Sequence, residues 1–138
     1  MKNILKISLV LFAVILCTSG NMVQGQELYI TVTDQHTPGP YSNNNTRYVA
    51  QWVIQDVNTL VPYTCTPNSG FWYYPNGFNN TSFAASLNAS STYVLWVQVT
   101  RYDFGNPTPV TTGLSRSDQF LGSDFIYTIF YMSVTLPQ

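Results

Sequence analysis

The residues that most often carry out catalysis are scarce and scattered in this chain. Its one histidine, His36, lies in a turn flanked by proline and glycine, and its acidic residues occur singly. A general acid or base must lie within hydrogen-bond reach of the reacting atoms. No two acidic residues have a spacing in the sequence that indicates a pair facing each other across a substrate. There is also no metal-ligand cluster, no phosphate-binding glycine loop and no nucleophile elbow. We therefore expect no catalytic residue, no metal site and no cofactor, and predict that the protein is not an enzyme.

Aromatic side chains offer the clearest binding chemistry. Phe71, Trp72, Tyr73 and Tyr74 are consecutive, and successive side chains of an extended chain point to opposite faces. Only one of the two pairs can enter a core, so the other is exposed unless a loop covers it. Flat rings pack against the C–H face of a sugar while amides and hydroxyls bind the sugar's hydroxyl groups.

Two other segments carry aromatic rings opposite their apolar residues. Trp96 has this place in an alternating run at residues 92–100, as do Tyr127 and Tyr131 in the last run, residues 124–136. If these runs are neighbouring strands, their rings share one outer face. Packing alone also explains such rings, because aromatic residues are favoured in strands. The predicted carbohydrate-binding residues are Trp72, Tyr73, Tyr74, Trp96, Tyr127 and Tyr131.

The N-terminus predicts export from the cell. Two lysines precede an apolar run at residues 7–17, which is shorter than the about 20 apolar residues of a membrane-spanning helix. This pattern is typical of a removable secretory signal peptide. Small residues favour cleavage after Gly25, with cleavage after Gly20 as the alternative. We expect residues 1–25 to be the signal and residues 26–138 to form one secreted, extracellular domain.

Glycosylation sequons support the same prediction. The pattern Asn-x-Ser/Thr occurs at Asn44, Asn79, Asn80 and Asn88. Asn79 and Asn80 are adjacent, so we expect only one of them to carry a glycan. Several sequons behind a signal peptide predict a glycoprotein whose modified segments lie in loops or at strand edges.

Cys65 is the only cysteine expected in the mature chain, because Cys17 lies inside the predicted signal. No intrachain disulfide can then form. Two interpretations stay open: a buried, unreactive thiol, or an intermolecular disulfide to a second copy or another protein. The second interpretation predicts a disulfide-linked dimer.

The charge of the predicted mature chain limits its partners. Residues 26–138 contain three arginines, six acidic residues and no lysine, a net formal charge of −3. A chain without a basic stripe lacks the electrostatic footprint that phosphate backbones require. We expect the partner to be a polysaccharide or an extracellular protein, and not a nucleic acid.

The hydrophobic pattern predicts an all-β fold. Runs rich in β-branched and aromatic residues alternate with clusters of proline, glycine, asparagine and serine. About seven short strands in about a hundred residues favour an antiparallel, immunoglobulin-like β-sandwich, with a small barrel as the alternative. The expected strands lie near residues 27–33, 48–57, 60–65, 70–74, 81–87, 92–100 and 124–136. The long stretch at residues 101–123 is expected to hold a further short strand near residues 110–112 or to be a functional loop. Alternation in the first strand places Tyr29 opposite its apolar residues. In the strands at 48–57 and 92–100, alternation places on the core side Tyr48, Ala50, Trp52, Ile54, Tyr93, Leu95, Val97 and Val99.

The last of these segments has two interpretations. It follows small residues and resembles the removable tail of a GPI-anchor signal. Three hydroxyl residues interrupt its apolar run, however, and its alternation favours a strand, so a membrane anchor is the less favoured alternative. In the strand, the inward residues would be Ile126, Phe130, Met132, Val134 and Leu136, and the outward ones Phe125, Tyr127, Ile129 and Tyr131.

Two family resemblances follow from these segments. Residues 80–101 resemble the tyrosine-corner region of fibronectin type III and immunoglobulin-like domains, in which a leucine precedes a turn and a tyrosine opens the next strand. Leu87 and Tyr93 hold those places, and Trp52 matches the core tryptophan of an early strand. The same segment, with the aromatic cluster before it, is similar to small cellulose-binding β-sandwich modules. The first resemblance implies adhesion or protein recognition, and the second implies polysaccharide binding. A structural glycoprotein with no discrete ligand is the third interpretation of the sequence.

Overall fold

The computed structural model describes residues 26–35, 46–73, 78–103 and 105–138. The predicted signal peptide, His36, Asn44 and Tyr74 lie outside these ranges. Within them no helix is long and apolar enough to span a membrane. The elements are β1 (Gln26–Asp34), β2 (Arg47–Asp56), β3 (Pro62–Tyr63), β4 (Ser69–Tyr73), β5 (Phe78–Phe83), β6 (Thr92–Tyr102), β7 (Thr111–Arg116), β8 (Phe120–Leu121), a short 3-10 helix η1 (Phe125–Tyr127) and β9 (Phe130–Leu136).

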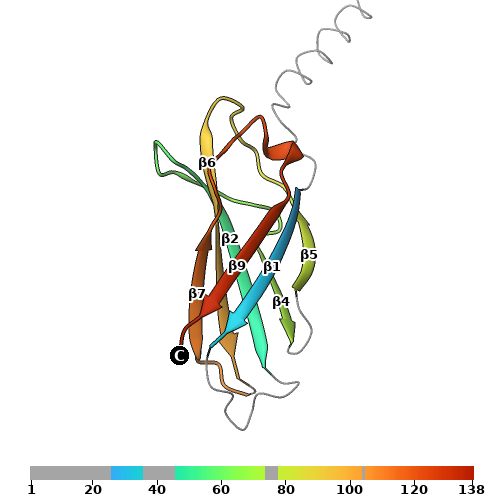
Figure 1. The fold of residues 1–138 in the computed structure, drawn as a ribbon, viewed down its shortest axis with the longest axis vertical. Helices are drawn as coiled ribbons and strands as arrows, with labels where there is room; N and C mark the ends of the chain where they lie inside the picture. The colour runs from blue at the N-terminus through green and yellow to red at the C-terminus, as the bar shows by residue number, and fades with distance from the viewer. Residues whose placement is uncertain (1–25, 36–45, 74–77, 104) are drawn as a thin grey trace, which may run out of the picture.

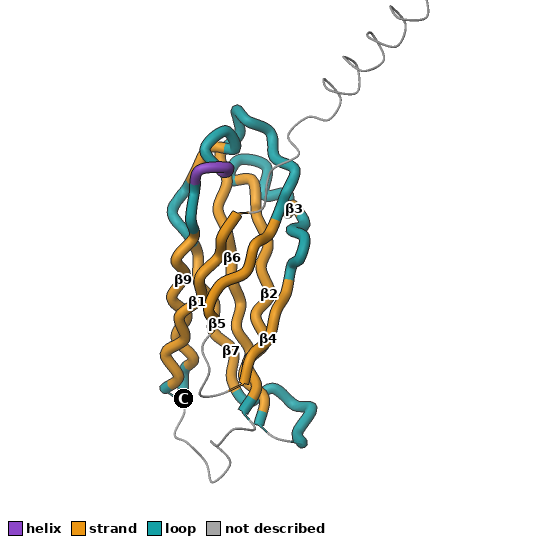
Figure 2. Tube along the Cα trace, turned by 90° about the vertical axis from the view of Figure 1, so that its right-hand side faces the viewer, coloured by secondary structure: helices purple, strands orange, loops and turns teal. Residues whose placement is uncertain are grey.

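The strands form two sheets that enclose one core (Figures 1 and 2). The three-stranded sheet has the order β5-β1-β9, and the six-stranded sheet has the order β3-β2-β6-β7, with β4 also paired to β2 and β8 to β6. Neighbouring strands are antiparallel except β1 and β9, which are parallel. The prediction of an all-β fold in two layers is confirmed, whereas the three-stranded sheet is mixed rather than purely antiparallel.

Period-two alternation explains the core. The inward residues of β2 and β6 are buried as predicted, and the Trp52 indole Nε1 donates a hydrogen bond of 2.8 Å to the Pro67 carbonyl. Fully burying one such apolar side chain contributes about 1.5–3 kcal/mol, so these two central strands supply a large part of the folding free energy. The inward apolar residues buried in the two strands are Tyr48, Ala50, Trp52, Ile54, Tyr93, Leu95, Val97 and Val99. Val94 and Thr100 of β6 are also buried, although they lie on the opposite face of the strand.

The segment before β9 differs from the prediction. The expected strand at residues 124–136 begins only at Phe130, because η1 interrupts it. The helical turn breaks the alternation, so Phe125 is buried and Ile126 is exposed, the reverse of the expectation. Phe125 packs against Phe83 with ring centroids 5.7 Å apart. The prediction of a strand is confirmed for the rest, since β9 alternates and contributes four buried side chains to the core.

The two sheets approach each other closely beside β7. A short strand was expected near residues 110–112, and β7 is longer, extending to Arg116. A Cβ atom at Gly113 would lie 2.3 Å from the Thr135 carbonyl oxygen and 2.8 Å from Val134 Cγ1, so only glycine fits. The Thr111 hydroxyl also donates a hydrogen bond of 2.9 Å to the Pro137 carbonyl. This contact joins the six-stranded sheet to the end of β9.

Candidate functional site

The register of β4 decides which of the consecutive aromatic rings are exposed. Trp72 is the cross-strand partner of Tyr48, an inward residue of β2, and paired residues share a face of the sheet. The two rings stack with centroids 5.5 Å apart, and Trp72 is only 9 % exposed. Phe71 and Tyr73 therefore point outward and are 62 % and 47 % exposed. Trp72, expected from the sequence at the surface, is a core residue, and Phe71 takes its place.

The outer surface of β4, β2, β6 and β7 forms a broad face that we call the four-strand face. At one end of it, Arg47 is the cross-strand partner of both Tyr73 and Tyr102. The Arg47 guanidinium lies over the Tyr102 ring, 5.2 Å from its centroid. Phe71 and Tyr73 are T-shaped, with centroids 6.0 Å apart. These rings form a ridge on the edge strand, beside a positive charge.

Two amides lie next to this ridge. Gln51 and Gln98 are cross-strand partners, and the same row continues to Ser69 on β4 and Leu114 on β7. Both amides are exposed, and neither has a hydrogen-bond partner within the described ranges. Each amide offers two donors and an acceptor, which suits the hydroxyl groups of a sugar.

Trp96 also lies on the four-strand face but is less available than expected. Its indole Nε1 already donates a hydrogen bond of 3.0 Å to Gln55 Oε1. The Arg116 guanidinium lies 5.7 Å from the ring centroid and covers one side of the ring. The indole N–H and one face of the Trp96 ring are therefore already in contact with other side chains and are not free to bind a ligand.

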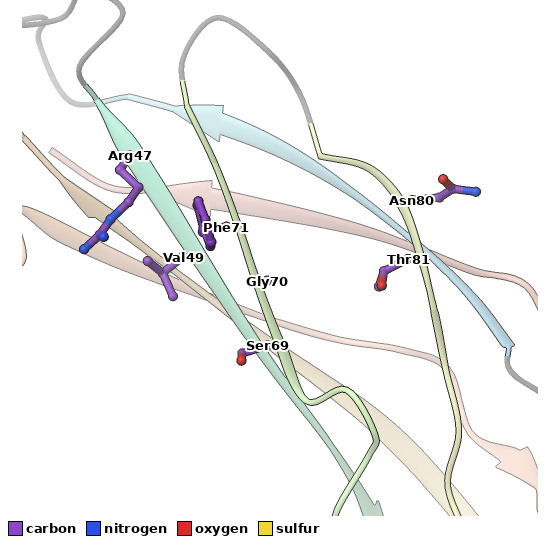
Figure 3. A pocket seen from close by; sticks show the side chains of 7 residues that line it. All are labelled: Arg47, Val49, Ser69, Gly70, Phe71, Asn80 and Thr81. Carbon is purple, nitrogen blue, oxygen red and sulfur yellow. The ribbon is translucent and has the colours of Figure 1, made fainter.

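Two hollows flank Arg47. One, of about 580 Å³, lies beside β4 near Gly70 and is lined by Phe71, Ser69 and Val49 on one side and by Asn80 and Thr81 of β5 on the other. Figure 3 shows Thr81 pointing from β5 toward β4, while Asn80 points away from it. The other hollow, of about 500 Å³, lies between Tyr73, Tyr102 and the loop that follows β6. The ridge is thus accessible from both sides.

Tyr127 and Tyr131 belong to a different surface. β9 pairs with β1 in the three-stranded sheet, whereas β6 lies in the other sheet, so Trp96 does not share a face with these tyrosines. Tyr131 is 73 % exposed and stacks on Tyr29, its cross-strand partner, with centroids 5.0 Å apart and planes inclined by 17°. Tyr127 is 82 % exposed on η1. The alternation of β1 gave Tyr29 an outward direction, but only the sheet pairing brings it to Tyr131.

Two of the predicted glycosylation residues have described side chains. Asn80 on β5 and Asn88 in the turn before β6 are both exposed. Asn88 Oδ1 accepts hydrogen bonds from the Ser90 backbone N–H at 3.0 Å and from its hydroxyl at 2.9 Å. The side chain of Asn79 lies outside the described part of the chain, as does Asn44.

Cys65 is a buried thiol. It has no disulfide partner among the described residues, and it packs in the core. Burial raises the pKa of this thiol to about 11, while a backbone hydrogen bond with Ile54 opposes the shift. A protonated sulfur enclosed by the core is chemically inert while the fold is intact.

Three of the described carboxylates, those of Asp34, Asp103 and Asp56, are held in structural contacts. Arg101 is buried between Asp34 on β1 and Asp103, with nitrogen to oxygen distances of 2.6 Å and 2.9 Å. The Asp56 carboxylate accepts the backbone N–H groups of Asn58 and Thr59. No group of three or more histidine, cysteine or acidic residues in the described ranges could hold a metal ion.

A hydrogen bond and two buried side chains fix the turn before β6. The Asn88 backbone N–H donates a hydrogen bond of 3.0 Å to the Tyr93 hydroxyl, and both Leu87 and Tyr93 are buried. This is the kind of backbone contact that defines a tyrosine corner.

No protein-family model matches this chain, and no curated protein or solved structure is significantly similar to it.

Proposed function

We propose that this protein is a secreted, non-enzymatic glycoprotein that binds a polysaccharide through the four-strand face. The observation that carries the proposal is the outward pair Phe71 and Tyr73 beside the exposed amides of Gln51 and Gln98. Rings supply the apolar contact with a sugar, and amides supply the directional hydrogen bonds. The ridge and the glutamine row carry no charge of their own, which suits a neutral ligand. The charged side chains around them are Arg47, Asp103 in the second hollow and Arg116 over Trp96.

The edge position of β4 favours an extended ligand. The ridge of Phe71 and Tyr73 has a hollow on each side, and Arg47 lines both hollows. A sugar chain lying along the ridge can contact both rings while its hydroxyl groups reach the glutamine row. We therefore expect the ligand to be a chain of several sugars rather than a monosaccharide.

The test is retention of the secreted protein on insoluble cellulose, chitin and β-glucan. We expect retention on one of these polysaccharides and a roughly tenfold or greater loss in the Phe71→Ala, Tyr73→Ala double variant, because one hot-spot ring contributes more than about 1 kcal/mol and 1.4 kcal/mol is tenfold. Gln51→Ala is expected to weaken retention without changing stability, since the side chain is exposed.

Tyr127→Ala provides the matched control. Tyr127 is more exposed than either ridge residue but lies on η1, away from the four-strand face. The control should bind as the unmodified protein does. Equal retention of the ridge variant and the unmodified protein would exclude the four-strand face as the binding site.

A second function, an immunoglobulin-like adhesion or interaction module, has one specific observation in its favour. The hydrogen bond from Asn88 N–H to the Tyr93 hydroxyl matches the tyrosine-corner resemblance. In this alternative the four-strand face would contact a protein. Absence of retention on every polysaccharide, together with capture of a protein partner that depends on Tyr73, would favour it.

A further inference from the structure

The three-stranded sheet carries an aromatic pair next to a sequon. Tyr29 and Tyr131 stack on the outer face, and Asn80 lies on β5, the strand on the other side of β1. The Asn80 side-chain Nδ2 donates a hydrogen bond of 3.4 Å to the Tyr29 hydroxyl. The atom that would be glycosylated is therefore already in contact with the aromatic pair.

The orientation of the two rings leaves one face of Tyr29 directed toward Asn80. Neighbouring strands lie about 4.8 Å apart, and the ring centroids of these partners are 5.0 Å apart with nearly parallel planes. The ring normals therefore run across the strands, so Tyr131 covers the face of Tyr29 on the β9 side. The other face of Tyr29 looks toward β5 and the Asn80 side chain.

We propose that Asn80, rather than Asn79, carries the N-linked glycan of this sequon pair, and that its first N-acetylglucosamine packs on the free face of Tyr29. The proposal rests on the secretory part of the proposed function and not on polysaccharide binding. The first sugar then covers the outer face of the three-stranded sheet beside Tyr29.

The modification is a group transfer from a lipid-linked oligosaccharide diphosphate. A bond forms between Asn80 Nδ2 and C1 of the first sugar, the bond from C1 to the diphosphate oxygen breaks, and Nδ2 loses one proton. The lipid diphosphate is the leaving group, and no oxidation occurs. One N–H remains on Nδ2, so the contact with the Tyr29 hydroxyl is compatible with the modification.

The surroundings of Tyr29 favour a fixed ring. Its hydroxyl donates a hydrogen bond of 2.8 Å to the Glu27 carboxylate, and this bond raises the pKa of the phenol. A ring held by Glu27 on its polar edge and by Tyr131 on one face loses little freedom when a sugar covers the other face. Asn88 is the other sequon residue with a described side chain. Its Oδ1 accepts hydrogen bonds from Ser90 in its own turn, and within the described ranges this side chain has no hydrogen bond with an aromatic residue.

Site mapping tests the first part of the proposal. The full 138-residue chain is produced in eukaryotic cells, and glycopeptides are identified by mass spectrometry after enzymatic release in heavy-oxygen water. Thr81→Val removes only the Asn79 sequon, and Ser82→Ala removes only the Asn80 sequon. We expect the label at Asn80 in the unmodified and Thr81→Val proteins and its loss from Asn80 in Ser82→Ala. A label at Asn79 alone, or at neither residue, overturns the proposal.

Thermal stability tests the packing on Tyr29. Ser82→Ala is compared with Ser82→Thr, which keeps the Asn80 sequon, and the comparison is repeated with Tyr29→Ser. We expect loss of the glycan to lower Tm by roughly 2–6 °C when Tyr29 is present and to have no such effect in its absence. An equal Tm difference in both backgrounds overturns the packing.

Polysaccharide retention is scored on the same preparations. Retention without a glycan at Asn80 overturns this inference alone. A glycan at Asn80 without retention on any polysaccharide overturns the binding function alone.

Discussion

Arg101 Nη1 lies 2.6 Å from Asp34 Oδ2, and this ion pair joins the six-stranded sheet to the three-stranded sheet. The Tyr48 hydroxyl donates a hydrogen bond of 2.9 Å to the same carboxylate oxygen, and Asp103 binds the guanidinium at Nε. Arg101 is buried, and its Nη2 has no hydrogen-bond partner in the described part of the chain. Removing a partner from a buried pair leaves an uncompensated charge, which is more costly than never having the pair.

Arg101→Met is therefore expected to lower the free energy of unfolding by about 3 kcal/mol, measured by urea denaturation. Arg116→Met is the matched control, because Arg116 is exposed and its guanidinium lies against the Trp96 ring, a contact worth about 0.5–1 kcal/mol. A cost for Arg101→Met as small as that of the control would show that the ion pair does not hold the sheets together.

Because the Cys65 thiol is buried, we expect it to react slowly with thiol reagents in the native protein. With a pKa of about 11, about one thiol in a thousand is ionised at pH 8. We expect no reaction with an aromatic disulfide reagent in the native protein on a timescale of minutes, and complete reaction in urea. A non-reducing gel should show the monomer, and a disulfide-linked dimer that disappears in Cys65→Ser would refute the buried, inert thiol.

Protonation of Asp56 is expected to account for part of the loss of stability at low pH. Hydrogen bonds from the Thr59 and Asn58 backbone N–H groups lower the pKa of Asp56 below its ordinary value of 3.8, against the effect of desolvation. Because the folded pKa is depressed, the stabilisation is present above the unfolded pKa and is lost as the pH falls through the folded value.

Asp56→Asn should therefore reduce the loss of stability between pH 6 and pH 2, measured as the difference in urea midpoints. The exposed residue Asp118 supplies the control, and Asp118→Asn should leave that difference unchanged. An identical pH dependence in Asp56→Asn and the unmodified protein would contradict the assignment.

Gly113 tests the contact between β7 and β9. A methyl group there would overlap the Thr135 carbonyl oxygen, which is backbone and cannot rotate away. We expect Gly113→Ala to cost about 1–3 kcal/mol or more in unfolding free energy. Gly105→Ala is the comparison, since a Cβ atom at Gly105 would have no neighbour within 4 Å and only the φ of 71° is unfavourable there. A smaller cost at Gly113 than at Gly105 would mean that the sheets do not approach beside β7.

The alternation of apolar residues predicted which way side chains point, but it did not predict which strands pair. The inward residues of β2 and β6 followed from period two alone, because one face of each strand is buried. Membership of a sheet depends on contacts between distant segments, and nothing in the local pattern placed β9 beside β1 rather than beside β6. The condition for a common face of Trp96 and Tyr131, that their strands be neighbours, is therefore not met.

Strand register and one helical turn limited the prediction of which aromatic side chains are exposed. The sequence required one pair among Phe71 to Tyr74 to be outward, but only the register with β2 shows that Trp72 is inward. Phe125 was assigned the wrong direction because η1, a single helical turn, reverses the phase of a segment that reads as a continuous strand. The first error comes from pairing with a distant strand and the second from a local turn, and neither is visible in the alternation of the sequence.

The proposed polysaccharide binding by the four-strand face is measured most directly as retention of the protein on insoluble polysaccharides, with the Phe71→Ala, Tyr73→Ala variant and the Tyr127→Ala control assayed in parallel. We expect the unmodified protein and the control to be retained on the same polysaccharide, and the ridge variant, still folded by circular dichroism, to be lost in the wash. Retention of the folded ridge variant at the level of the unmodified protein would contradict binding through this face.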